Sequence, residues 1–290
     1  MAIKTLEQTQ TSSRFPHISE EQLALQHRTR PDSDITDDIR RVLQEDTVLR
    51  ATADQIDARV NAGVVHLGGY VPTHSHKVRA ETDVRQVQGI RQVENNLIAD
   101  PDLEALVTQQ LTRDARLCGY TIFVHTTDGV IRLDGQVDSG ELADAAERLA
   151  ATVPNVRAVV NCIQSPDVAN RQPAQVFLPR SDQEVFASDG LLGRVDQVVM
   201  NPHNRRVTAI VVDAHFYNES LATERRLFIP IAAVRNVNAS GIELNLTVNE
   251  ADRCADFDPA KFVMPDRNWQ PPLDYVPNDL LLESNGVIRG

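Results

Sequence analysis

The chain has 290 residues, 41% of them hydrophobic, and a formal net charge of −12. This length indicates two or three domains, each with enough apolar residues to bury a core. The acidic excess argues against nucleic-acid binding, which needs Lys and Arg to displace counterions from the phosphate backbone, and against simple polybasic attraction to anionic lipid.

The segment 1–32 is predicted to be an N-terminal tail. Its start, MAIKTLEQTQTSSRFPH, lacks the apolar centre of a secretory signal, and nothing in the chain matches the roughly 18 apolar residues of a membrane-spanning helix. The three cysteines, Cys118, Cys162 and Cys254, are far apart and form no C-x-x-C pair, which is typical of reduced thiols. We therefore expect a cytoplasmic protein and leave open a peripheral position at the inner membrane.

The segment 33–100 alternates between helical and strand patterns. Apolar residues at helical spacing over 35–43 predict a helix, which Ser33 or Asp34 can cap. Alternating polarity over 56–60 predicts a strand, and GVVHLGGYV at 63–71 is its return strand. A second helix and a last strand follow, which gives the order α-β-β-α-β.

The same pattern recurs in the segment 101–166. Residues 63–97 align with 129–163 without a gap, and GVIRLDGQV at 129–137 is the counterpart of the return strand. Upstream, 35–49 align with 103–117. Matching apolar positions over this length indicate two copies of one domain.

Glycines at equivalent places in the two copies are predicted to be structural. Gly63 and Gly129 follow the first strand of each copy, where a tight hairpin needs a positive φ. Gly69 and Gly135 come near the end of the return strand, which indicates a bulge or a close backbone approach where a Cβ would clash.

The phrase G-V-[VI]-x-L-x-G-x-V and the ending [IV]-R-x-V-x-N-x-[LI], in this order of elements, resemble the BON domain family. The family is named after osmotically induced and nodulation proteins, and the resemblance covers 33–100 and 101–166. It implies binding to phospholipid surfaces or other macromolecules, in a stress-related role. Many members are periplasmic, whereas the start of this chain favours a cytoplasmic surface.

The segment 167–182 is polar and contains prolines, which is typical of a linker. Over 183–250, short apolar runs between turn residues predict a small all-β barrel or sandwich. Ser188-Asp189-Gly190, Gly193-Arg-Val-Asp196 and Ile229-Pro-Ile231 resemble the PRC-barrel family, which occurs in the H subunit of photosynthetic reaction centres. The resemblance implies a compact barrel that docks onto a partner and carries no shared catalytic residues.

Candidate docking residues lie in this segment and in the tail, 251–290. They are Arg205, Arg206, Arg225, Arg226, Trp269 and Tyr275. The arginine pairs are either simple rim charges or contacts for an acidic partner or a lipid headgroup. The aromatic residues belong to a proline-broken tail, which either wraps its own barrel or docks as a peptide on a partner.

No catalytic, cofactor-binding or metal site is predicted. His74 and His76 lack a third ligand and are expected to be a solvated helix start. The chain has no Gly-rich phosphate loop, G-x-S-x-G or H-E-x-x-H motif.

The sequence thus predicts an α+β chain of two tandem α-β-β-α-β modules plus a small C-terminal all-β barrel. We expect a non-enzymatic binding or scaffold protein without a cofactor, which engages a phospholipid membrane surface or a protein partner and gains avidity from its repeated modules. The alternative is a structural or assembly subunit of a larger membrane or photosynthetic complex, docked through the barrel. Nucleic acid is not an expected partner, and a homo-oligomer is left open.

Overall fold

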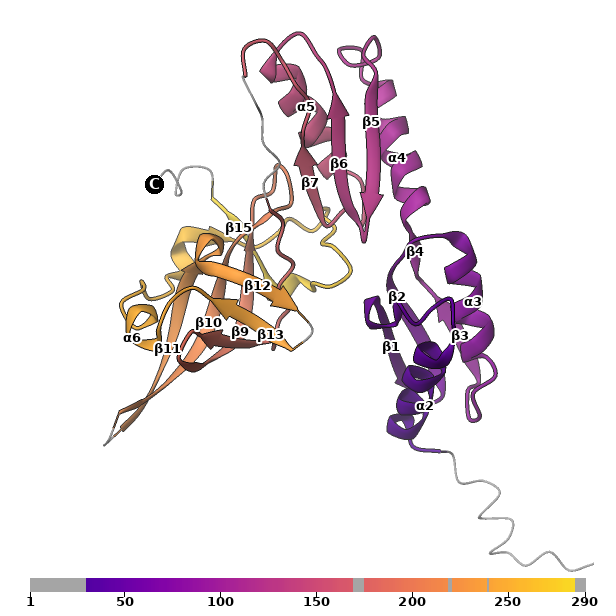
Figure 1. The fold of residues 1–290 in the computed structure, drawn as a ribbon, viewed down its shortest axis with the longest axis vertical. Helices are drawn as coiled ribbons and strands as arrows, with labels where there is room; N and C mark the ends of the chain where they lie inside the picture. The colour runs from indigo at the N-terminus through magenta and orange to yellow at the C-terminus, as the bar shows by residue number, and fades with distance from the viewer. Residues whose placement is uncertain (1–29, 169–174, 219–220, 239, 285–290) are drawn as a thin grey trace, which may run out of the picture.

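The computed structural model describes residues 30–168, 175–218, 221–238 and 240–284. These residues form three units, each with its own β-sheet (Figure 1). We call them module 1 (residues 32–99), module 2 (residues 100–168) and the C-terminal unit (residues 175–284). The mixture of helices and several small sheets is the α+β class that the sequence predicts.

Module 1 has the expected order of elements. They are α2 (Asp32–Glu45), η1 (Ala53–Gln55), β1 (Ile56–Asn61), β2 (Val64–Val71), α3 (His74–Val84), β3 (Gln92–Asn95) and β4 (Ile98–Ala99). The central strand is β2, which runs antiparallel to β1 and parallel to β3. Both helices bury one apolar face against this sheet in a single core. The free edge of the sheet opposite β1 is therefore β3.

The N-cap of the first helix lies two residues before Ser33 and three before Asp34, the two predicted caps. Pro31 occupies its N-cap position, and neither Ser33 nor Asp34 caps it. The carboxylate of Asp32 instead accepts two backbone N–H groups of the β1–β2 turn, at 2.7 and 3.0 Å. Asp100 does the same for the equivalent turn of module 2, at 3.0 and 3.1 Å. Each copy thus ties the start of its first helix to its hairpin.

Module 2 repeats the plan of module 1. Its elements are α4 (Asp100–Arg113), β5 (Ile122–Thr127), β6 (Val130–Gly135), α5 (Gly140–Ala151) and β7 (Ala158–Asn161). The strand order is β5-β6-β7, with β7 parallel to β6 at one edge. Helix α4 starts directly after β4 and leads from one module into the next (Figure 1). The two copies are therefore joined without a linker.

Strands are the main regular structure of the C-terminal unit. They are β8 (Glu184–Ala187), β9 (Gly190–Met200), β10 (Val207–Asn218), β11 (Leu221–Pro230), β12 (Val234–Asn238), β13 (Gly241–Leu244), β14 (Phe262–Val263) and β15 (Leu280–Glu283). The described helices are α6 (Val248–Ala251) and the short 3-10 helices η2 (Ile231–Ala233), η3 (Pro259–Lys261) and η4 (Pro277–Asp279). The main path is β11-β10-β9-β8-β13-β12. Residues from β8 to β13 and from β15 share one core, so the sheet curls around it. Among the described residues, β11 and β12 do not pair with each other.

The C-terminal tail wraps its own unit, which is one of the two arrangements that the sequence leaves open. Strand β15 runs parallel to β9 and pairs Leu280 with Val198, and β14 pairs with β15. The N-terminal tail up to residue 29 and linker residues 169–174 lie outside the described residues.

Candidate functional site

The three units meet in a joint that begins with Tyr70 on β2. Its side chain leaves module 1 and packs in the core of module 2, with only 2% of the residue exposed. Its hydroxyl donates a 2.7 Å hydrogen bond to the carbonyl oxygen of Asn155, and burial raises the pKa of this phenol well above its usual value. Gly129 leaves room for the ring, because a Cβ there would lie 2.4 Å from it. Tyr70 therefore fixes module 1 against module 2.

Arg157 connects all three units. It is buried just before β7 and forms an ion pair with Asp274 of the C-terminal tail. Its guanidinium also donates to the carbonyl of Asp128 at 3.3 Å and lies 5.3 Å from the centre of the Tyr70 ring. The counterpart in module 1, Arg91, makes the same bond to the β1–β2 turn at 3.2 Å but is exposed. The arginine is thus present in both modules, and in module 2 it also pairs with the C-terminal tail.

The β9–β10 turn of the C-terminal unit closes the free edge of β7. The carbonyl of Asn204 accepts the N–H of Val159 at 2.9 Å. Arg205 donates to the carbonyl of Val156 at 3.1 Å and lies 4.8 Å from the centre of the Trp269 ring. Burial lowers the pKa of Arg205 to about 10, and the aromatic face compensates part of this desolvation.

An ion pair accompanies this backbone contact. Glu147 on α5 accepts a hydrogen bond from Asn161 at 3.0 Å with one oxygen and pairs with Arg206 at 2.9 Å with the other. Both charged side chains are largely buried, with 11% of Glu147 and 26% of Arg206 exposed. A pair at this depth is screened less than a surface pair.

Module 1 contains the same glutamate with a different partner. Glu81 accepts from Asn95 at 3.0 Å with one oxygen, as in module 2, but its other oxygen binds Arg85 one turn along its own helix, at 2.5 Å. The residue equivalent to Arg85 is Ala151, which is buried. The module 2 glutamate binds Arg206 of the C-terminal unit instead.

The outer faces of the two edge strands, β7 in module 2 and β3 in module 1, also differ in polarity and burial. Ala158 and Val160 on β7 are buried. Their counterparts on β3 are Gln92, which is exposed, and Glu94, whose side chain is 43% exposed. The C-terminal unit therefore finds an apolar edge on module 2 and a polar, solvated edge on module 1.

The structure brings most of the candidate docking residues together inside this joint. Arg205, Arg206 and Trp269 belong to the contacts above, and Tyr275 is 2% exposed and donates a 2.5 Å hydrogen bond to the carbonyl of Pro179. Arg205 and Tyr275 were expected to face an external partner, but both are buried within the chain.

The other arginine pair lies apart from this set and also binds its own chain. Arg225 pairs with Asp252 at 2.6 Å and with Asp256 at 2.7 Å. Arg226 pairs with Asp196 and lies 4.8 Å from the centre of the Phe257 ring. Both arginines thus hold the segment after α6 against β11 and β9.

The glycines singled out in the sequence occupy strained or crowded positions. Gly63 and Gly129 have φ values of 76° and 75°. Gly69 has a φ of 103°, and a Cβ there would lie 2.1 Å from the carbonyl oxygen of Gln55. Gly135 has a φ of 151°, and its Cβ would lie 2.7 Å from the Thr121 carbonyl oxygen. A side chain at either return-strand glycine would meet backbone.

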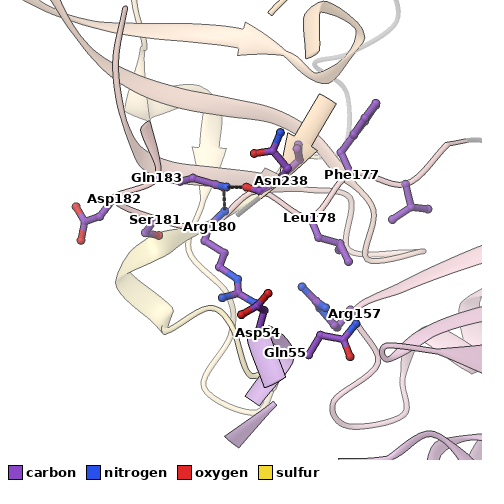
Figure 2. Close-up of a pocket in the computed structure, with 12 residues that line it drawn as sticks. Asp54, Gln55, Arg157, Phe177, Leu178, Arg180, Ser181, Asp182, Gln183 and Asn238 are labelled. Atoms are coloured by element: carbon purple, nitrogen blue, oxygen red, sulfur yellow. Dashed lines mark hydrogen bonds between the residues drawn. The ribbon is translucent and has the colours of Figure 1, made fainter. Parts of the chain in front are cut away.

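A cavity of about 640 Å³ opens between the three units. Gln55 of η1 and Arg157 line one part of it, and the segment 176–183 with Val237 and Asn238 lines the rest (Figure 2). The walls combine charged, polar and apolar side chains. No single module could form this cavity.

In the part of the chain that the structure describes, no group of three or more His, Cys, Asp or Glu side chains is arranged to hold a metal ion. The Nε2 atom of His74 lies 3.4 Å from a carboxylate oxygen of Asp102. A search of the same residues for a helix long and apolar enough to cross a bilayer found none.

Sequence reasoning missed Tyr70, Arg157, Glu147 and Asp274. A signal was present in the differences between the copies. Tyr70 aligns with a glutamine, and Arg85 aligns with an alanine. Residues that depart from an otherwise matching repeat indicate where one copy meets something that the other does not.

Two segments of the chain, residues 31–101 and 99–165, match the family model of the BON domain. Osmotically-inducible protein Y of Escherichia coli (strain K12) is 26% identical over 147 residues, which cover 46% of this chain and 72% of that protein. Neither match indicates a catalytic family.

Two solved structures of CdsD, described as a structural protein of the type III secretion system of Chlamydia trachomatis, are also similar. One has a TM-score of 0.38 and 19% identity over 46% of this chain and 61% of that chain. The other, its C-terminal domain, has a TM-score of 0.32 and 20% identity over 39% and 54%. The present chain thus spans less than two thirds of either solved chain.

The family matches end at residue 165, so the PRC-barrel resemblance of the C-terminal unit stays a prediction. For the first half, the family model, the alignment of the repeat and the repeated order of elements agree. Residues 31–101 and 99–165 thus each match the BON domain model, in tandem.

Proposed function

We propose that this protein is a non-enzymatic binding scaffold that uses its BON domains as docking platforms for protein. The observation that carries the proposal is the contact between module 2 and the C-terminal unit. There the edge of β7 and Glu147 receive a turn of another folded unit through one backbone hydrogen bond and one ion pair. A BON domain in this chain thus has the chemistry of a protein-binding surface.

Module 1 is the copy with a free surface for an external partner. Its edge strand β3 is covered by no described part of the chain, and its outer face carries Gln92 and Glu94. Such a polar edge suits a partner that supplies a basic or amide-bearing segment. The likeness to Osmotically-inducible protein Y supports a stress-related setting for this scaffold.

A phospholipid surface is the second candidate. Module 1 exposes 46% of Val48 and 64% of Val78. The aligned residues in module 2 are Arg116 and Asp144, so only the first copy presents apolar side chains at these places. Apolar side chains of this kind can insert at a membrane interface.

The two candidates are separated by variants of the full chain. The proteins are the unaltered chain, Glu94→Lys on β3, Val78→Asp on α3, and the control Glu243→Lys on the C-terminal unit. Affinity capture from the native host identifies protein partners, and co-sedimentation with phosphatidylglycerol–phosphatidylcholine vesicles measures lipid binding. We expect a captured partner to be retained by Glu243→Lys and lost by Glu94→Lys.

A partner retained equally by all variants would overturn the role of the β3 edge. Sedimentation with vesicles that Val78→Asp abolishes, in the absence of any captured partner, would replace the scaffold by the lipid-surface function.

A further inference from the structure

Strand β5 forms one edge of the module 2 sheet, on the side away from β7 (Figure 1). Among the described residues it pairs only with β6, and the C-terminal unit contacts the opposite edge through Val159. Strand β1 has the same position in module 1, where it pairs only with β2. An edge strand presents backbone N–H and C=O groups that can pair with another strand. The two modules therefore offer equivalent edges that can be compared directly.

The outer face of β1 carries charged side chains, whereas that of β5 does not. On β1, Asp57 and Arg59 are largely exposed and form an ion pair at 2.8 Å. The aligned residues on β5 are Phe123, which is 57% exposed, and His125, which is also exposed. No Asp, Glu, Lys or Arg occurs in β5. Charged side chains discourage pairing of an edge strand, so this protection is present in module 1 and absent in module 2.

The core of module 2 gives no reason for a phenylalanine at position 123. The next residue, Val124, points into that core, so Phe123 lies on the opposite face of the strand. Across the strand pair, Phe123 lies opposite Asp134 and His125 lies opposite Arg132. These two charged residues of β6 bind each other at 2.7 Å. The Phe123 ring therefore gains little from its own module and leaves more than half of its surface in water.

The sequence around β5 is complementary to a second copy of itself. Residues 121–127 read TIFVHTT, which is nearly symmetric about Val124. If two copies pair antiparallel about a two-fold axis at Val124, Phe123 lies opposite His125 of the second copy, and Thr121 lies opposite Thr127. Each pair then occurs twice, and aromatic and Thr–Thr pairs both stabilise antiparallel strands. No like charges face each other across these strands, although each chain has a net charge of −12.

We propose that this protein forms a two-fold symmetric homodimer by antiparallel pairing of β5 with β5 of a second copy. The two module 2 sheets become one continuous sheet, and the second copy covers the exposed Phe123 ring. The contact involves one short strand from each chain, so the dimer is of the weak class and forms at high protein concentration. The proposal does not rest on the docking role of β3, which lies in the other module.

The test is analytical ultracentrifugation of the full chain over a concentration series. We expect a reversible equilibrium between monomer and dimer. Phe123→Asp, which substitutes the residue found at this place in module 1, should raise the dimer dissociation constant about tenfold or more. Leu191→Asp on β9 is the matched control, because Leu191 is also 57% exposed, and it should leave the dissociation constant unchanged.

Amide hydrogen exchange locates the contact. With rising concentration of the unaltered chain, residues 122–127 should exchange more slowly, and Phe123→Asp should remove this effect. The equivalent strand β1, residues 56–61, is the internal control and should exchange at the same rate at every concentration.

Three outcomes would overturn the proposal. A chain that stays monomeric up to about 1 mM has no dimer of measurable affinity. A dimer that is equally strong in Phe123→Asp, with a circular dichroism spectrum showing an intact fold, does not use this edge. Protection that appears at residues 92–95 instead of 122–127 would place the self-association on β3.

Discussion

Residues that align between the two modules can make different contacts. Arg91 and Arg157 bind the same turn in their own copies, yet only Arg157 is buried and paired with Asp274. A guanidinium carries five donors, so Arg157 can keep its original bond and add others. The two arginines therefore keep the same bond to the turn and differ in their surroundings.

Neighbouring glycines on β2 provide a sharp test of backbone crowding. Gly69→Ala should lower the free energy of unfolding by about 1–3 kcal/mol, because its φ is 103° and the new Cβ meets a carbonyl oxygen. Gly68→Ala is the matched control, since a Cβ there has nothing within 4 Å. Urea unfolding measures both. Equal stability of the two variants would refute the close approach.

Asp114 should make stability depend on acid pH. Hydrogen bonds from the Arg116 side chain and backbone hold the pKa of this carboxyl at about 2, below its usual 3.8. A carboxyl with a depressed folded pKa contributes stability that is present above the unfolded pKa and is lost as pH falls through the folded one. The contribution is therefore lost between pH 3.8 and about 2.

Asp114→Asn lacks this proton uptake. We expect the difference in the free energy of unfolding between the unaltered chain and the variant to shrink as pH falls through that window. Arg116→Ala removes the side-chain hydrogen bonds and the charge, which include the largest cause, but keeps the backbone N–H, so it should have the same effect to a smaller extent. Parallel pH profiles for all three proteins, measured by urea unfolding, would rule out the assigned cause.

At the scale of elements, the edge strands explain which copy the C-terminal unit binds. Strand β7 is apolar on its outer face, and Glu147 on α5 binds Arg206, while the position equivalent to Arg85 is the alanine Ala151. Strand β3 is polar on its outer face, and the equivalent glutamate of module 1, Glu81, binds Arg85 of its own helix. Exposed edge strands invite pairing, and the polar side chains of β3 keep the C-terminal unit from pairing with the wrong module.

The ion pair of Arg206 with Glu147 should hold the C-terminal unit in place. Arg206→Ala should lower the free energy of unfolding by about 1.5–3 kcal/mol, because it removes a charged hydrogen-bond partner from a largely buried carboxylate. Arg194→Ala is the control. Its pair with Glu184 is exposed and should be worth about 1 kcal/mol or less.

Trp269, the single tryptophan of the chain, reports directly on this docking. Its ring lies under Arg205 in the joint, so we expect its fluorescence emission to shift to longer wavelength in Arg206→Ala and to stay unchanged in Arg194→Ala. An unshifted emission in both variants would mean that the joint does not depend on this pair.

At the scale of the whole molecule, the sequence predicts a first proteolytic cut within 165–182, because this segment is polar and contains prolines. From the structure we also expect the two resistant fragments to remain together after the cut. Contacts of Arg157, Arg205 and Arg206 join one fragment to the other. Co-elution on a sizing column measures this. Arg206→Ala should weaken it, and fragments that separate at once at low salt would contradict a stable joint.

Much of the local structure of this protein could be predicted from its sequence. Apolar spacing at 35–43 and alternation at 56–60 gave the helix and strand now seen as α2 and β1, because these periods follow from backbone geometry. The start of α2 lies two to three residues earlier than the predicted caps place it, and the carboxylate of Asp32 is used for a contact with a distant turn. Strand β15 was not predicted, because its partner β9 lies far away in the sequence.

The sequence by itself determined the repeat, the α-β-β-α-β order and the β-rich third unit, because local periodicity and turn chemistry act over a few residues. The tertiary structure alone decided that Arg205 and Tyr275 are buried and that β7 rather than β3 is covered. It also decided that Gln55, Arg157 and Ser181 share one cavity. These outcomes depend on which surfaces meet, and residues more than a hundred positions apart become neighbours only when separately folded units pack together.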